Sequence, residues 1–226
     1  VTVIYKEENG EGQDYSNPTL IEVDENGRVV DVSNTPAVMK RRLVSMRMYI
    51  LRKELLMELI ERCIARGEHN FSKDALIRNM DKLAIYGYPF KGYVARMNST
   101  SSFFRHNMAL LNPAVWQELF FGAGAVYTKV KDEAPTKYRS GACVNNSLIA
   151  SGCVIEGTVE NSIIFRGVKI RPGAYVANSI VMQKSDIGPN AFIEYTICDK
   201  DVRILSEKHL KGEKNYPLVI KKGTVI

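Results

Sequence analysis

Asn146-Ser147-Leu148-Ile149 is a motif that recurs along the chain. It returns as Asn161-Ser162-Ile163-Ile164, as Asn178-Ser179-Ile180-Val181 and, in altered form, as Tyr195-Thr196-Ile197-Cys198. The hydroxyl residues of the four copies are 15, 17 and 17 residues apart. This regular spacing indicates an internal structural repeat.

Inside the repeat one aliphatic residue returns every six positions, as in Ile164, Ile170 and Val176, with glycines between. Three such hexads make a coil of about eighteen residues with three flat sides, so the pattern predicts a β-helical solenoid. An antiparallel sandwich, the alternative, would show strict alternation and less regular glycine. We expect coils from about Val144 to Ile204, with these residues pointing inward: Ile155, Ile164, Ile170, Val176, Ile187 and Ile193.

The composition is that of a globular protein, with 45% hydrophobic and 25% charged residues. The net charge of +6 comes from 31 basic and 25 acidic residues, and Lys40-Arg41-Arg42 is the longest basic run. Such dispersed charge argues against a nucleic-acid partner and suits a small phosphorylated metabolite better.

Four cysteines show neither a paired spacing nor a neighbouring histidine, so we expect reduced thiols, no metal site and a cytoplasmic protein. Because no apolar stretch approaches the roughly 20 residues of a membrane span, we expect no membrane partner. Val1 to Tyr5 does not resemble a signal peptide. The chain opens without Met on a strand-like pattern, which suggests an internal segment of a longer protein.

The first half alternates strand and helix patterns, which predicts an α/β domain. Asn26-Gly27 favours a hairpin between two apolar runs, at 19–23 and 29–32. We expect helices at 55–64, at 75–80 capped by Ser72, and after Ser99 or Thr100, with strands at 83–86 and 93–97. The predicted domains are a partial α/β domain at 1–125, a linker at 126–143 and the β-helix at 144–226.

Repeats of this kind resemble the left-handed parallel β-helix of hexapeptide proteins, which include acyltransferases and sugar nucleotidyltransferases. Acyltransferases of this kind use a histidine on the coils as general base. The coils from Val144 to Ile204 contain no histidine, which disfavours the acyltransferases.

Several motifs that precede the repeats resemble those of bacterial glucose-1-phosphate adenylyltransferase, in matching order and spacing. They include Val44-Ser45-Met46-Arg47-Met48-Tyr49-Ile50, His69-Asn70-Phe71-Ser72-Lys73-Asp74 and Ala134-Pro135-Thr136-Lys137-Tyr138. The resemblance implies the later part of a Rossmann-like nucleotidyltransferase domain followed by the β-helix. In that family the Gly-rich loop that binds the nucleotide phosphates lies upstream of this segment.

The chain departs from the family pattern at the charged side chains that bind the substrates and the metal. The sugar-phosphate lysine of a Glu-Lys-Pro motif corresponds to Thr35, after Asn34, and the glucose-binding aspartate to Asn70. The aspartate that helps to hold magnesium corresponds to Arg96, which would repel the cation. Of the substrate-binding positions only Ser45 is retained.

Losing the lysine and the metal carboxylate together should abolish useful turnover, because this chemistry depends on positioning and charge neutralisation. We therefore expect no catalytic residue and no cofactor in this chain, with Mg²⁺ and ATP bound by a catalytic partner. The pattern resembles the GlgD-type regulatory subunit, which implies a hetero-oligomer acting in glycogen synthesis. Two alternatives stay open: sugar-phosphate binding without turnover, and an active sugar nucleotidyltransferase of another specificity.

Two lysines near the end of the chain match positions where plant relatives bind activator phosphates. Lys200 follows Ile197-Cys198-Asp199, and Lys221 follows Val219-Ile220. Arg203 could add a bidentate contact to a phosphate. The alternative is that these cations are solvated coil ends, and the sequence does not identify an effector.

Overall fold

The computed structural model describes residues 1–7, 18–33, 42–122, 124, 126–128 and 130–226. The chain divides into two compact units, Val1–Gly92 and Tyr93–Ile226. Each unit is described by itself below.

Unit 1 is built on a mixed sheet in the order β3-β2-β4-β1-β5. Its strands are β1 (Thr2–Glu7), β2 (Leu20–Val23), β3 (Val29–Ser33), β4 (Leu43–Ile50) and β5 (Tyr86–Pro89). Strand β1 lies between β4, which is antiparallel to it, and β5, which is parallel. The predicted hairpin is confirmed as β2 and β3, and Gly27 supplies a φ of 77° in its turn.

Helical segments cover one face of this sheet. They are α1 (Lys53–Ala65), the π-helical turn η2 (Phe71–Leu76) and the 3₁₀ turn η3 (Ile77–Asn79). Leu59 and Leu76 pack with Val3, Ile21 and the other residues of one apolar core. No helix in the described part of the chain is long and apolar enough to cross a membrane.

The opposite face of the sheet carries exposed apolar side chains. Thr2 pairs with Ile50 and Tyr86, so these two residues share its face, and both are exposed. Met48 and Tyr88 flank Ile4 in the same way and are also exposed. Unit 1, as described, therefore leaves one side of its sheet open.

Three local predictions in this half were wrong. The strand expected at 83–86 is instead β5 (Tyr86–Pro89), because it is residues 86–89 that pair with β1. Asn70, not Ser72, caps the second helical segment, because its side-chain oxygen accepts from the backbone N–H of Lys73. Tyr93 to Met97 forms no strand. Instead, the Tyr93 N–H donates to the Glu118 carboxylate, and its hydroxyl contacts His106, so side chains direct the backbone there.

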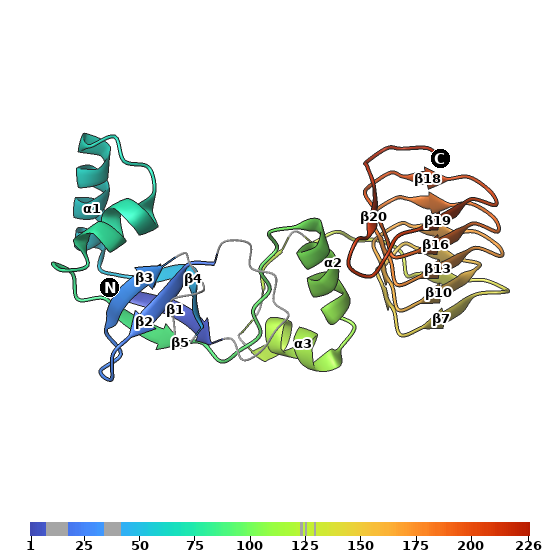
Figure 1. The fold of residues 1–226 in the computed structure, drawn as a ribbon. Coiled ribbons are helices and arrows are strands. Elements are labelled where there is room, and N and C mark those ends of the chain that lie inside the picture. The colour runs from blue at the N-terminus through green and yellow to red at the C-terminus, as the bar shows by residue number, and fades with distance from the viewer. Residues whose placement is uncertain (8–17, 34–41, 123, 125, 129) are drawn as a thin grey trace. The chain divides into compact units, whose positions relative to one another are not determined.

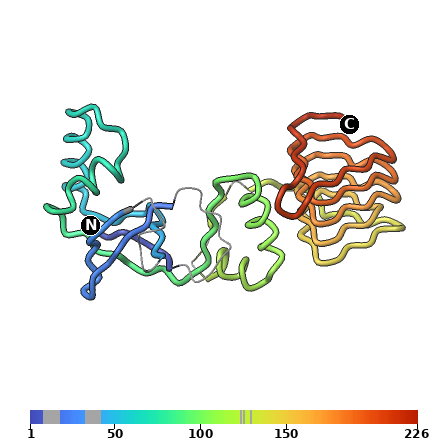
Figure 2. The backbone as a smooth tube through the Cα atoms, in the orientation of Figure 1, coloured from blue at the N-terminus to red at the C-terminus, as the bar shows by residue number. Residues whose placement is uncertain are grey.

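The β-helix of unit 2 consists of three parallel sheets, each of five strands in the described chain. Figure 1 shows one of them, with β7, β10, β13, β16 and β19 stacked in order, and the coils are clear in Figure 2. The three sheets comprise β6 (Lys137–Tyr138), β9 (Val154–Ile155), β12 (Lys169–Ile170), β15 (Asp186–Ile187) and β18 (Arg203–Ile204); β7 (Cys143–Asn145), β10 (Thr158–Glu160), β13 (Tyr175–Ala177), β16 (Phe192–Glu194) and β19 (His209–Lys211); and β8 (Leu148–Ile149), β11 (Ile163–Ile164), β14 (Ile180–Val181), β17 (Thr196–Cys198) and β20 (Leu218–Ile220).

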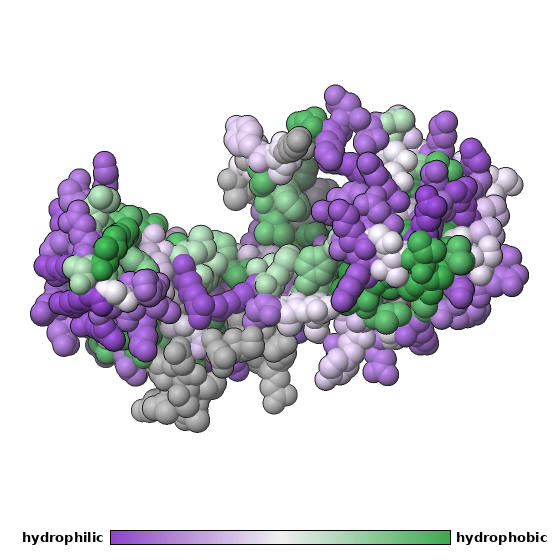
Figure 3. Space-filling view, turned by 90° about the horizontal axis from the view of Figure 1, so that it is seen from above, coloured by the Kyte–Doolittle hydropathy of each residue, from purple (hydrophilic) through white to green (hydrophobic). Residues whose placement is uncertain are grey.

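The predicted interior of the β-helix is confirmed. The six aliphatic residues expected to point inward are all buried and belong to one core cluster. Figure 3 views the end of the β-helix that carries the C-terminus, where hydrophilic side chains predominate around a hydrophobic group.

The repeated motif, which begins at Asn146, Asn161 and Asn178, forms one corner of each coil. Asn146, Asn161 and Asn178 adopt φ angles of 41°, 44° and 46°, a conformation that asparagine tolerates better than most residues. The hydroxyl oxygen of each following serine accepts from the backbone N–H of the aligned residue one coil later, for example Ser162 from Ser179 at 3.0 Å. A ladder of buried hydroxyls therefore connects the coils.

Three helical segments precede the β-helix within unit 2. They are α2 (Thr100–Ala109), α3 (Pro113–Gln117) and the π-helical turn η4 (Glu118–Gly122). Ser99 caps α2 as predicted, in a reciprocal capping box with Ser102. Phe104 of α2 packs against Ile180 and Ile197 on the outer face of β14 and β17.

The boundaries of the compact units differ from the predicted domains. Because α2 packs on the β-helix, the division falls after Gly92, whereas the sequence placed the end of the first domain at residue 125. Strand β6 already pairs with β9, although it lies in the segment 126–143 that was predicted to be a linker.

Candidate functional site

Ser45 lies in the middle of β4 at an irregularity of the sheet. Tyr5 pairs with Ser45 while the preceding Ile4 pairs with Met48, so two residues of β4 bulge out between these pairs. One of them, Arg47, has a φ of 55°. Ser45 is buried, and its hydroxyl accepts from the Arg47 N–H at 3.2 Å. The retained serine is therefore held by the bulge.

A small cavity of about 30 Å³ lies beside Ser45. Three further hydroxyl residues line it, Thr19, Tyr49 and Ser72, and the rest of the lining is aliphatic. The Tyr49 and Ser72 hydroxyls are hydrogen-bonded to each other at 2.7 Å. The cavity has room for about one water molecule, so these groups could bind a water or one hydroxyl group, but not a whole sugar phosphate.

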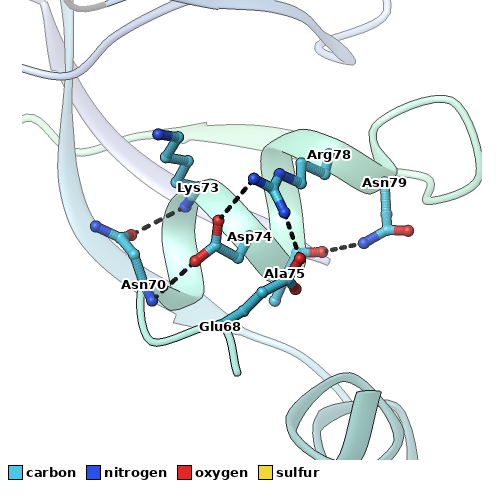
Figure 4. Close-up of polar contacts among 7 residues, drawn as sticks. All are labelled: Glu68, Asn70, Lys73, Asp74, Ala75, Arg78 and Asn79. Carbon is cyan, nitrogen blue, oxygen red and sulfur yellow. Dashed lines mark hydrogen bonds and ion pairs between the residues drawn. The ribbon is translucent and has the colours of Figure 1, made fainter. Parts of the chain in front are cut away.

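Asn70 is part of a polar network at the start of η2 (Figure 4). Its side-chain oxygen accepts from the Lys73 N–H at 3.0 Å, and its own N–H donates to the Asp74 carboxylate at 3.1 Å. Arg78 forms ion pairs with both Asp74 and Glu68. Asn70 thus has a structural task as a helix cap, which an aspartate could also perform.

The remaining predicted substrate positions are not part of the described residues of unit 1. Asn34 and Thr35 lie outside the described residues. Arg96 belongs to unit 2, where it is half-buried. Its guanidinium offers no oxygen ligand to a cation, and the described residues contain no group of three or more His, Cys, Asp or Glu side chains placed to hold a metal.

The structure places Lys200 and Lys221 at one corner of neighbouring coils. Strand β17 pairs with β20 through Cys198 and Ile220, and each lysine follows the end of its strand. The Gly223 N–H donates to the Lys200 carbonyl at 2.9 Å, which ties the two turns together. Both lysines are exposed, so this corner presents two positive charges to solvent.

Arg203, the third predicted effector residue, lies in a different sheet. It is the first residue of β18 and pairs with Asp186 of β15. Asp186 in turn pairs with Lys169 of β12, so the three residues form one row across β12, β15 and β18. Neither Asp186 nor Lys169 was among the predicted site residues. A sequence signal was present, because Lys169, Asp186 and Arg203 are spaced by 17 residues, the spacing of the later coils.

The two units together define the class of protein: it combines a mixed α/β unit with a parallel β-helix of the hexapeptide-repeat type. The family model for the GlmU-like C-terminal hexapeptide domain matches residues 130–215. This match covers most of the β-helix.

Comparison with curated proteins specifies the relationship further. The chain is 40% identical over 181 residues to the glycogen biosynthesis protein GlgD of Bacillus subtilis (strain 168), covering 80% of this chain and 52% of that protein. It is 44% identical over 182 residues to the GlgD of Geobacillus stearothermophilus, with the same coverage of 80% and 52%. It is 31% identical over 204 residues to the glucose-1-phosphate adenylyltransferase of Bacillus mycoides (strain KBAB4), covering 89% of this chain and 54% of that enzyme.

The chain is a homologue of the GlgD glycogen biosynthesis proteins and is related to the glucose-1-phosphate adenylyltransferases. It spans about half the length of the curated relatives that it matches.

Proposed function

We propose that this chain is part of a cytoplasmic regulatory subunit of glucose-1-phosphate adenylyltransferase, impaired in catalysis, that acts with a catalytic subunit in glycogen biosynthesis. The observation that carries the proposal is the higher identity to GlgD proteins, 40–44%, than to the adenylyltransferase, 31%. The residues Thr35, Asn70 and Arg96 support it, because they replace a lysine and two carboxylates that, by the resemblance, hold the sugar phosphate, the glucose and magnesium in the enzymes.

The direct test measures ADP-glucose synthesis from ATP and glucose 1-phosphate. The full-length subunit alone should show little or no synthesis, and it should raise or reshape the activity of a co-expressed catalytic subunit. Robust synthesis by the isolated subunit would overturn the proposed impairment. Turnover only with another nucleotide or another sugar phosphate would favour the second hypothesis, an active nucleotidyltransferase of another specificity.

A matched variant tests whether a lack of activity is caused by these residues or by inactive purified protein. The full-length triple variant Thr35→Lys, Asn70→Asp and Arg96→Asp restores the charges of the catalytic pattern. Aspartate can still cap η2, so the exchange at Asn70 should not disturb folding. A gain of synthesis in this variant supports impairment through these residues, whereas no gain limits the cause to other parts of the subunit.

The effector part of the proposal assigns a phosphorylated metabolite to the corner of Lys200 and Lys221. Two exposed ammonium groups on tied turns can serve a phosphate as point charges. In the reconstituted complex, the double variant Lys200→Ala and Lys221→Ala should weaken the response to the effector and leave the basal rate unchanged. An unchanged activation curve would remove both lysines from the mechanism.

A further inference from the structure

The sheet of β6, β9, β12, β15 and β18 carries two adjacent rows of side chains on its outer surface. The strand register and the backbone hydrogen bonds align the members of each row. The first row is Lys137, Val154, Lys169, Asp186 and Arg203, and the second is Arg139, Glu156, Arg171, Gly188 and Leu205.

Both carboxylates of these rows are already engaged by arginines. Arg139 donates to Glu156 at 2.9 Å. Arg171 donates through Nε and Nη2 to the two oxygens of Asp186, at 2.8 and 2.7 Å. This bidentate geometry is the strongest form of the arginine–carboxylate contact.

The positive charge around Asp186 exceeds what its carboxylate can neutralise. Lys169 and Arg203 flank Asp186 directly in register, and neither forms an ion pair with a carboxylate in the described chain. The hydrogen bond from Arg171 holds the pKa of Asp186 below its usual range, and the charges of Lys169 and Arg203 act in the same direction. Three cations thus surround one anion, which leaves a surplus of two positive charges.

A hollow of about 430 Å³ opens at this point of the surface. It forms because Gly188 contributes no side chain to the second row, between Arg171 and Leu205. A Cβ atom at Gly188 would lie 2.6 Å from the Ile204 carbonyl oxygen, so the close approach of the next coil excludes a side chain. The hollow is lined by Lys169, Arg171, Asp186, Gly188, Pro189, Arg203, Ile204, Leu205 and Ser206.

We propose that the hollow over Gly188 is an anion site that takes the phosphoryl group of a small molecule. A phosphate monoester carries about 1.5 to 2 negative charges near neutral pH, which matches the local surplus better than a single carboxylate does. Lys169 and Arg203 supply the charge, and the Ser206 hydroxyl can donate one hydrogen bond to a phosphate oxygen. The site is distinct from the corner of Lys200 and Lys221 and does not depend on the proposed function.

The test is a titration of the 226-residue chain with inorganic phosphate at constant ionic strength, followed by the amide NMR signals of Gly188 and Ser206. Constant ionic strength is essential because these charges are exposed and salt screens them. Saturable shifts should appear at both amides. The double variant Lys169→Gln and Arg203→Gln should weaken phosphate binding at least about tenfold, since it removes both surplus charges.

Two matched variants complete the experiment. Lys137→Gln with Lys208→Gln removes the same charge at two positions that do not line the hollow and should bind phosphate as the unaltered chain does. Lys200→Ala with Lys221→Ala should also leave the shifts at Gly188 and Ser206 intact. The proposal is overturned if these amides do not shift saturably, or if all three double variants weaken binding equally.

Discussion

Ser179 shows how a single serine connects three coils. It is fully buried, donates to the Ala177 carbonyl at 2.7 Å and accepts from the Thr196 N–H at 3.1 Å. Its own N–H donates to the Ser162 hydroxyl of the preceding coil. A buried amide that loses its acceptor suffers the full desolvation penalty, so the ladder is a continuous requirement along this corner.

We expect Ser179→Ala to lower the free energy of unfolding by about 1–3 kcal/mol, because it leaves the Thr196 N–H and the Ala177 carbonyl without this partner. Urea unfolding followed by circular dichroism measures the change. Ser147→Ala, in the first copy of the repeat and half-buried, is the matched control with a smaller expected loss. Equal losses in the two variants would contradict a role for burial.

Asp186 gives the chain a defined response to acid. Its pKa is lowered in the folded state by Arg171 first, and further by Lys169 and Arg203. A carboxyl with a lowered folded pKa stabilises the fold above its unfolded pKa and loses that contribution as the pH falls through the folded pKa.

Asp186→Asn should therefore destabilise the chain near neutral pH, and this loss should shrink as the pH falls below about 4. Unfolding free energies of both proteins between pH 2 and 7 test the difference. Curves that stay parallel over this range would show that the ion pair with Arg171 does not contribute to folding. The effect should be modest because the pair is partly exposed.

At the scale of elements, helix α2 packs against a residue that departs from the repeated motif, Tyr195. Tyr195 stands where the other copies have asparagine, and it adopts the same conformation with a φ of 47°. Its ring packs against Phe104 of α2, with 6.4 Å between the ring centroids. In this copy of the repeat a tyrosine therefore takes the backbone conformation that asparagine has in the others, and its ring contacts α2.

Phe104→Ala should release α2 from the β-helix while the coils stay folded. The side chain is buried against Ile180 and Ile197, and its removal should cost about 3–5 kcal/mol of docking free energy. Hydrogen exchange should then accelerate in α2 and remain slow at Ile170 and Val176. Accelerated exchange throughout the coils would mean that α2 is integral to the β-helix.

The elements that the sequence predicted well are those with a local cause. The six-residue period places Ile164, Ile170 and Val176 inside because each coil repeats the same steric demand. The Ser99 cap and the Gly27 turn depend on a few neighbouring residues only. The π-helical turn after Asn70 includes Ser72, which hydrogen-bonds to Tyr49, 23 residues away. The irregular segment from Tyr93 to Met97 involves Glu118, 25 residues away from Tyr93.

The candidate sites were predictable to a smaller degree. Lys200 and Lys221 were predicted from a resemblance to plant relatives, and the pairing of β17 with β20 brings them to one corner. The hollow at Gly188 could not be predicted from the sequence, because it depends on which residues of neighbouring coils are aligned and on the missing side chain among them. The hydroxyl cavity beside Ser45 needed the sheet and η2 together, because Tyr49 and Ser72 come from different elements.

At the scale of the whole molecule, the two units have cores of different kinds. Unit 2 encloses its apolar residues within three sheets. Of the twelve largest fully buried side chains among the described residues, ten belong to unit 2, among them Ile155, Ile170 and Ile193. Unit 1 buries one face of its sheet and exposes apolar residues such as Ile50 and Tyr88 on the other. Separate cores favour separate unfolding.

Calorimetry of the chain should therefore show two transitions, with unit 1 unfolding at the lower temperature. Assignment can follow NMR signals of Val3 and Leu59 for unit 1 and of Ile170 for unit 2. A single transition reported identically by all three residues would show that the units unfold cooperatively.

The hydroxyl ladder also has a direction, which matters during synthesis of the chain. Each coil presents an oxygen that is filled by an amide from the coil made next, as Ser162 is filled by Ser179. The series stops at Thr196, because the Leu218 N–H after Pro217 donates to the Tyr195 carbonyl instead. From Ser147 to Ser179, a coil that folds first presents an acceptor to the coil that is translated after it, so we expect these coils to be able to assemble in the order of translation.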